Sequence, residues 1–295
     1  MVQCARHHSQ YSMQACSYGF AGHMERPIKH IVPTQAAAVL GEHGGFGHSR
    51  VEKFRHDGFV SFDSAVAEVG GGYDECHHRF TSFASSIVEN LNIHDVVTAD
   101  RVVSRMAVYS PTMGDERGEL SFTISGSHFD NLRIAGHKFD VKLATHVFQE
   151  HDTHSKVSNA HRASKLDQWL LGSKLARLSE KELEEVENTY HALGGMTEVL
   201  KGWKVKGEKR RDDVIIFSAL NHIKIEDHAG PNTELLGFGS IICIPKFGVV
   251  RLGELKVQKH HRSLLMLRVD MCSAGSGGSG TGGTGTGGSG NPGGK

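Results

Sequence analysis

Residues 88–93 read VENLNI, and residues 129–134 read FDNLRI. The two hexapeptides share an acidic residue, an Asn, a Leu and an Ile in the same order. Because alternate side chains of a β-strand point to one face of its sheet, the Leu-x-Ile spacing predicts two strands that each bury a Leu and an Ile. Weaker echoes occur in ALNHIKI (219–225) and RLGELKV (251–257). We interpret the repeat as a hairpin unit used several times, although chance matches between β-rich segments are the alternative.

The sequence around the repeats has the two-residue period and the Val, Ile, Thr and Phe content of strands. Residues 58–69 predict a strand or hairpin that ends in a turn at GGGYDE (70–75). Residues 80–109 predict at least two strands, broken near His94 and Asp95. Further strands are expected within 120–148, 213–227, 240–258 and 264–271.

A helical insertion interrupts this pattern. In SEKELEEVENTYHALGG (179–195), Ser179 is suited to the N-cap and Glu182 completes a capping box. Leu183, Val186 and Tyr190 recur at helical spacing, and two glycines end the helix. A shorter helix is expected at 166–178.

These patterns divide the chain into five segments. They are an N-terminal arm (1–47), β modules (48–154), the helical insertion (155–211), further β modules (212–272) and a Gly/Ser/Thr-rich tail (273–295). The composition of the last segment is typical of a flexible linker or tail. The predicted fold class is mainly β, with antiparallel hairpin modules that form a sandwich or a solenoid-like sheet.

Composition limits the classes of partner. Lys+Arg and Asp+Glu both number 33, which argues against nucleic acid as an obligate partner, because phosphate binding favours a basic excess. A net charge of zero also removes the repulsion between copies. The 21 His residues would make the chain strongly positive on mild acidification, so assembly that responds to pH is conceivable, although ordinary exposed histidines are the alternative.

Cysteines and hydropathy say little about the compartment. The five Cys (4, 16, 76, 243 and 272) lie far apart and form no CxxC, so neither a zinc ribbon nor a dense disulfide framework is expected. No segment has the length of a transmembrane helix, and residues 1–20 lack the apolar core of a signal peptide.

Three runs follow an order seen in a known group of proteins. They are SSIVENLNIHDVVTADRVVSRMAV (85–108), SGSHFDNLRIAGHKFDV (125–141) and GPNTELLGFGSIICIP…FGVVRLGELKV (230–257). This order resembles the bacterial choice-of-anchor surface proteins of the P type, over roughly residues 80–145 and 222–271. The resemblance implies a secreted, β-rich bacterial protein of the cell surface or extracellular space, without known enzymatic activity. The lack of a visible signal peptide keeps a cytoplasmic location as the alternative.

Candidate chemistry is sparse. The densest metal-ligand candidates are Cys76 and His77 in one segment and His151, Asp152 and His154 in another, because thiolate, imidazole and carboxylate groups all suit zinc. A glycosidase carboxylate pair could lie among Asp57, Asp63, Glu68, Asp74 and Glu75. Trp169 and Trp203 could stack on a sugar, although a core role is the simpler explanation. No cofactor motif and no nucleophile or phosphate-loop motif occurs.

We therefore predict a non-enzymatic, self-associating structural protein whose partners are copies of itself. The alternative is a β-sandwich module that binds carbohydrate or another cell-surface ligand, and the third hypothesis is a metal-dependent hydrolase.

Overall fold

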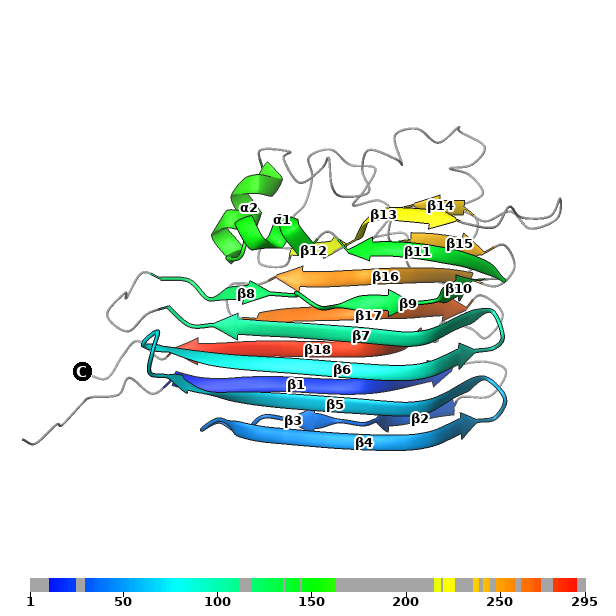
Figure 1. Ribbon diagram of the computed structural model, residues 1–295, viewed down its shortest axis with the longest axis horizontal. Coiled ribbons are helices and arrows are strands. Elements are labelled where there is room, and N and C mark those ends of the chain that lie inside the picture. The colour runs from blue at the N-terminus through cyan, green and yellow to red at the C-terminus, as the bar shows by residue number, and fades with distance from the viewer. Residues whose placement is uncertain are drawn as a thin grey trace, which may run out of the picture.

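The computed structural model describes residues 11–24, 30–111, 118–134, 136–143, 145–162, 215–218, 220–225, 236–238, 241–244, 248–257, 261–271 and 278–290. The chain forms two antiparallel sheets, sheet A and sheet B, which lie face to face with their strands roughly aligned (Figure 1). Strand β1 lies against β5 and β6, and β17 and β18 lie against β7. The mainly β fold class is thus confirmed, and of the two arrangements expected the chain adopts the sandwich.

Sheet A is built from both ends of the chain. Its strand order is β14-β15-β16-β17-β18-β1-β2, with β12 beside β16 and β3 beside β1. The bounds are β1 (Tyr11–Met24), β2 (His30–Gln35), β3 (Ala38–Val39), β12 (Ile215–Ser218), β14 (Leu236–Phe238), β15 (Ile241–Ile244), β16 (Gly248–Val257), β17 (His261–Met271) and β18 (Gly278–Gly290).

Sheet B is built from the middle of the chain. Its order is β13-β11-β10-β7-β6-β5-β4, and the short strands β8 and β9 also pair with β7. The bounds are β4 (Gly45–His56), β5 (Val60–Asp74), β6 (Arg79–Ile93), β7 (Val97–Tyr109), β8 (Ser121–Thr123), β9 (His128–Asp130), β10 (Leu132–Ile134), β11 (His137–Leu143) and β13 (Leu220–Ile225). The predicted break at His94 and Asp95 is confirmed as the turn between β6 and β7.

The core lies between the two sheets. As the repeat predicts, both of its Leu-x-Ile pairs are buried there: Leu91, Ile93, Leu132 and Ile134. The rings of Phe20 in sheet A and Phe62 in sheet B lie 6.3 Å apart. Small residues bring the sheets closer elsewhere, since a Cβ on Gly19 would lie 2.7 Å from the Cβ of Ala65.

The turn predicted at residues 70–75 is wrong, because β5 continues through the glycines to Asp74. The reason is a close packing contact. A Cβ on Gly70 would lie 2.3 Å from the ring of Phe83 in the neighbouring strand. A Cβ on Gly71 would lie 2.9 Å from the carbonyl oxygen of Thr81. These glycines therefore make room for neighbours, and the chain turns only afterwards, at residues 75–78.

Two short helices, α1 (Thr145–Glu150) and α2 (His154–Arg162), cover one end of the sandwich (Figure 1). Phe148 packs 6.1 Å from Phe122 of β8, measured between ring centroids. The carboxylate of Glu119 accepts hydrogen bonds from the backbone N–H and the hydroxyl of Ser155, at the first turn of α2. The helices predicted at 166–178 and 179–195 lie outside the described residues. No helix within the described ranges is long and apolar enough to cross a membrane.

The described parts of the two terminal segments contribute strands to sheet A. Residues 11–24 form β1, and the glycine-rich residues 278–290 form β18 between β1 and β17. A strand without large side chains suits this place because β18 lies against β6 and β7 of the opposite sheet. Their buried residues include the small side chains of Ala84, Ser86 and Ser104.

Candidate functional site

The repeated hexapeptide marks a change in backbone conformation. Asn90 in β6 has a φ of 52°, and Asn131, between β9 and β10, has a φ of 49°. Both values lie in the left-handed region, which Asn tolerates better than most residues. β6 and β9 both pair with β7, so the two copies of the repeat flank one strand.

A third copy of the repeat lies in β4 and is missed by inspection of the sequence. Residues 51–56 read VEKFRH, and Lys53 occupies the place of the two asparagines, with a φ of 53°. The shared Val-Glu of VEKFRH and VENLNI is the signal that could have found it. The match is hard to see because VEKFRH has Lys and Phe at the positions where VENLNI has Asn and Leu.

The left-handed residue interrupts the alternation of side chains along the strand. In β6, Glu89 and Asn90 both lie outside the core, between buried Val88 and buried Leu91. The register brings corresponding polar pairs of neighbouring strands into line across sheet B. We call this set the double row; it consists of Glu52, Lys53, Asp63, Ser64, Glu89, Asn90, Asp100, Arg101, Asp130 and Asn131.

Hydrogen bonds cross the double row from strand to strand. One carboxylate oxygen of Glu89 accepts a hydrogen bond from the guanidinium of Arg101 at 2.7 Å, and the other accepts one from the hydroxyl of Ser64 at 2.8 Å. The amide Nδ2 of Asn90 donates to Asp63 at 2.8 Å. In the same way, Asn131 donates to Asp100 at 3.3 and 3.2 Å. The Asn of each repeat thus bonds an Asp of the adjacent strand.

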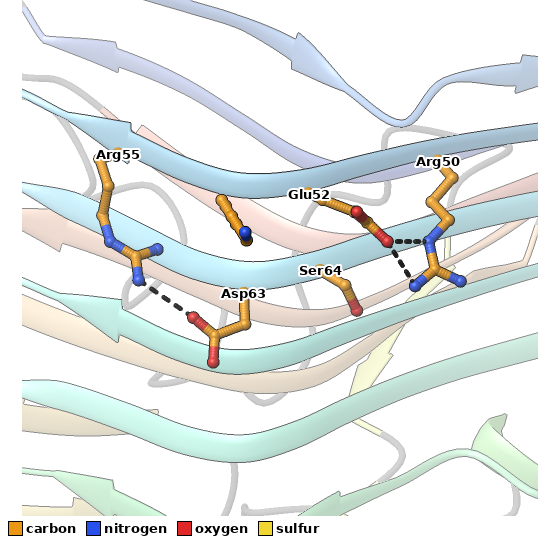
Figure 2. Close-up of a pocket in the computed structure, with 6 residues that line it drawn as sticks. Arg50, Glu52, Arg55, Asp63 and Ser64 are labelled. Carbon is orange, nitrogen blue, oxygen red and sulfur yellow. Dashed lines mark hydrogen bonds and ion pairs between the residues drawn. The ribbon is translucent and has the colours of Figure 1, made fainter.

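Arginines of β4 extend this network to the edge of sheet B. Figure 2 shows Arg55 reaching Asp63, with 3.0 Å between Nη2 and Oδ1, and Arg50 reaching Glu52 along its own strand at 2.7 Å. The six residues around these pairs line a shallow hollow on the surface: Arg50, Glu52, Lys53, Arg55, Asp63 and Ser64. Its lining is polar and charged, whereas a binding cleft for a sugar ring usually presents an aromatic face.

Hydrogen bonds favour the ionised forms of Asp63 and Glu89. Hydrogen bonds from Arg55 and then from Asn90 lower the pKa of Asp63 below its usual value. Hydrogen bonds from Arg101 and then from Ser64 lower the pKa of Glu89. A glycosidase general acid needs the opposite, a raised pKa. The double row is therefore suited to joining strands by charge-assisted hydrogen bonds rather than to donating protons.

The predicted metal ligands lie in two separate segments. Cys76 and His77 belong to the turn between β5 and β6, where Nδ1 of His77 lies 2.7 Å from Oδ2 of Asp74. His151 and Asp152 lie between α1 and α2, and His154 begins α2. Within the ranges that the structure describes, no three His, Cys, Asp or Glu side chains gather closely enough to hold a metal ion. Trp169 and Trp203 lie outside those ranges.

A second surface feature combines aromatic residues with glycine. Phe46 in β4, Gly70 in β5 and Phe83 in β6 lie opposite one another in the register of sheet B. The ring of Phe83 covers Gly70 and remains 39% exposed, and Phe46 is 67% exposed. We call these three residues the aromatic strip. It presents two exposed aromatic side chains on the outer face of the sheet.

A third feature is an unpaired strand edge. Strand β4 is the last strand of sheet B, and among the described strands it pairs only with β5. It contacts β2 and β3 at the margin of sheet A (Figure 1). One large apolar side chain of β3, Val39, is 73% exposed, and a Cβ on Gly47 of β4 would lie 3.2 Å from the backbone oxygen of Val39. We call residues 45–49 of β4, together with Val39, the open edge.

Comparison with known proteins adds a family without an assigned function. No curated protein and no solved structure matches the chain. The domain of unknown function DUF8256 matches residues 11–258, which include every strand of sheet B. Because this match covers far more than half of the sequence, the chain belongs to the DUF8256 family.

Proposed function

We propose that this protein is a non-enzymatic structural subunit that associates with copies of itself through the open edge. The observation that carries the proposal is the start of β4 at residues 45–49, whose outer side pairs with none of the described strands and carries the exposed side chain of Phe46 next to that of Val39. An exposed strand edge is a template for pairing with another strand. The zero net charge of the chain does not oppose association.

The two halves of β4 differ in how well they suit pairing. Residues 50–56 carry Arg50, Glu52, Lys53 and Arg55, and the left-handed Lys53 interrupts the regular strand. Charges and backbone irregularities are the means by which proteins protect sheet edges from pairing. Residues 45–49 carry no Lys, Arg, Asp or Glu and include Phe46. Pairing is therefore directed to the first half of the strand.

A second copy suits this edge because the strand can pair with itself. In an antiparallel arrangement centred on His48, residues 45–51 of two copies pair before Lys53 is reached. This arrangement places Phe46 opposite Arg50 of the partner subunit, an aromatic–cation contact. It also has the two-fold symmetry that is commonest among protein dimers.

The apolar residues of the open edge support weak, reversible association. Covering a side chain that is two-thirds exposed contributes about 1–2 kcal/mol. Val39 and Phe46 of two copies together contribute about 4–8 kcal/mol before costs, and association costs about 4–15 kcal/mol. Because the gain and the cost are of similar size, the particle should dissociate on dilution.

The test is the mass of the native particle as a function of concentration. Wild type should grow in mass with concentration, and Phe46→Asp should remain a monomer because it adds a charge at the unpaired edge. Phe83→Asp is the matched control: it places the same change on the same sheet face, but on a central strand. Equal association of Phe46→Asp and wild type would overturn the proposal.

A bacterial surface or extracellular setting is part of the same proposal. Its support is the resemblance of segments 85–108, 125–141 and 230–257 to the P-type choice-of-anchor proteins. Secretion of the full chain, followed with an antibody in fractionated cells of its source, tests this setting. Recovery from the cytoplasm alone would contradict it.

The aromatic strip favours one second candidate function, the binding of a carbohydrate. Sugar rings stack their apolar faces on exposed aromatic rings, and Phe46 and Phe83 present two such rings on the same face of neighbouring strands. Phe83→Ala should then weaken retention on insoluble polysaccharides without changing the particle mass. Val39→Asp should lower the particle mass without changing retention on the polysaccharide, since Val39 belongs to the open edge and not to the aromatic strip. Retention that is the same for Phe83→Ala and wild type would exclude the strip.

A further inference from the structure

The glycine-rich strand β18 joins the two terminal parts of sheet A. Its residues 278–290 pair with β1 on one side, from Tyr11↔Gly290 to Gly22↔Ser279. On the other side they pair with β17, from His261↔Gly287 to Asp270↔Gly278. In Figure 1, β18 lies between β17 and β1 behind β6 and β7. We call the place that it fills the slot.

The walls of the slot match a strand of small residues. Thr284 lies opposite Ser17 of β1 and Leu264 of β17, and both of these are buried. Gly285 lies opposite Cys16 of β1, whose side chain is exposed. Beneath the slot, β6 and β7 present small buried residues such as Ser86 and Ser104.

β18 is held mainly by its backbone. Eight of its thirteen residues are Gly, and the others are Ser and Thr. Glycine within a strand is destabilising relative to alanine because of its backbone entropy, so this strand is intrinsically weak when it stands alone. Inside the slot it gains ladder hydrogen bonds along both flanks. A segment of this kind can leave the slot without taking large apolar side chains out of the core.

We propose that the slot can be filled either by residues 278–290 of its own chain or by the same residues of a second copy. Exchange of this strand then links copies. The occupant is this segment because both flanking strands, β1 and β17, pair with it in register along its length, and because its sequence has only small residues. Exchange of an identical element between copies conserves every contact of the strand, which makes it a low-cost route to oligomers. This surface is separate from the open edge, and the two can be tested separately.

The register supplies a cross-link that reports where the strand comes from. Cys16 is a free, exposed thiol opposite Gly285. In full-length Gly285→Cys, a disulfide between positions 16 and 285 forms within one chain when β18 occupies its own slot, and between chains when it is exchanged. Oxidation removes one proton and one electron from each thiol and transfers them to added diamide. Peptide mass mapping after non-reducing electrophoresis identifies the linked cysteines.

Exchange predicts covalent dimers and larger species that contain the 16–285 disulfide, and more of them when the protein is oxidised after incubation at high concentration. A 16–285 disulfide confined to monomers at every concentration would overturn the proposal, and so would the absence of that disulfide. Cys16→Ser in the same background is the control, because it should remove the cross-link. Gln14→Cys with Gly287→Cys, a neighbouring pair in the register, repeats the test if Gly285→Cys does not fold.

The contribution of the open edge to association can be tested separately in the same cross-linking experiment. Adding Phe46→Asp to Gly285→Cys should leave the interchain 16–285 disulfide in place, since the slot does not contain Phe46. Loss of the cross-link in that variant would overturn exchange as a separate contact. Failure of the open-edge proposal alone would instead appear as an unchanged mass of the Phe46→Asp single variant.

Discussion

The left-handed conformation of Asn90 predicts an unusual order of stability for two small substitutions. Both Asn90→Ala and Asn90→Gly lose the 2.8 Å hydrogen bond to Asp63, so that loss cancels between them. Alanine must then hold its Cβ at a φ of 52°, which costs roughly 1–2 kcal/mol, whereas glycine adopts this region without strain. After the greater backbone entropy of glycine is subtracted, Asn90→Gly should be more stable than Asn90→Ala by about 0.5–1 kcal/mol.

Asn92 is the matched control on the same strand. It donates a 2.7 Å hydrogen bond to Asp95 and pairs with Ser61 and Thr98 in ordinary extended backbone. There the order should reverse, with glycine less stable than alanine by about 0.5–1 kcal/mol. The assay is urea unfolding of the four full-length variants, with the free energy of unfolding compared within each pair. A lower free energy of unfolding for the glycine variant than for the alanine variant at both positions would refute the left-handed conformation of the repeat. It would also refute the alignment of the double row that depends on it.

Three further predictions concern the sheets. Stability should fall on acidification, because the pKa values of Asp63 and Glu89 are lowered in the folded state. The stability that these two groups contribute is present above their unfolded pKa values of about 4 and is lost as pH falls through the lower folded values. Urea midpoints measured between about pH 5 and pH 2 should therefore decline less steeply in Arg101→Met than in wild type. Gly70→Ala should lower the melting temperature because the new Cβ displaces the ring of Phe83. In the Phe83→Ala background, Gly70→Ala should no longer lower it; if the changes in melting temperature of the two single variants simply add in the double variant, the ring does not pack on the glycine. Gly19→Ala should cost about 1–3 kcal/mol of unfolding free energy because its Cβ meets that of Ala65 at 2.7 Å, and Ala65→Gly should restore part of it; a neutral Gly19→Ala would show that the sheets are farther apart.

The sequence predicts the strands best where side chains alternate. The Leu-x-Ile pairs of the repeat are buried because a period of two is imposed by the pleat of any strand, whatever its partner. The left-handed backbone at the Asn is less visible, since Asn also occurs in extended strands. The copy at Lys53 is hidden further, because only the observed φ makes Lys equivalent to Asn.

Glycine is where sequence-based reasoning fails in this chain. Gly70 and Gly71 have the composition of a turn, but they lie within β5 because Phe83 and the backbone of Thr81 occupy the space of a Cβ. Residues 278–290 have the composition of a linker, yet they form β18. In both cases the structure depends on tertiary neighbours, and a strand propensity based on side chains contains no information about them. The open edge likewise depends on strand order, which no local pattern determines.

Hydrogen exchange of the β4 amides tests the proposal of edge pairing most directly. Exchange of the full-length protein would be followed by mass spectrometry of peptides that cover residues 45–49 and 50–56, at low and at high protein concentration. Pairing through the open edge predicts that protection of 45–49 rises with concentration, while 50–56, with its charges and left-handed Lys53, changes much less. If the particle grows in mass with concentration while exchange at 45–49 stays constant, copies associate through another surface and the proposal is contradicted.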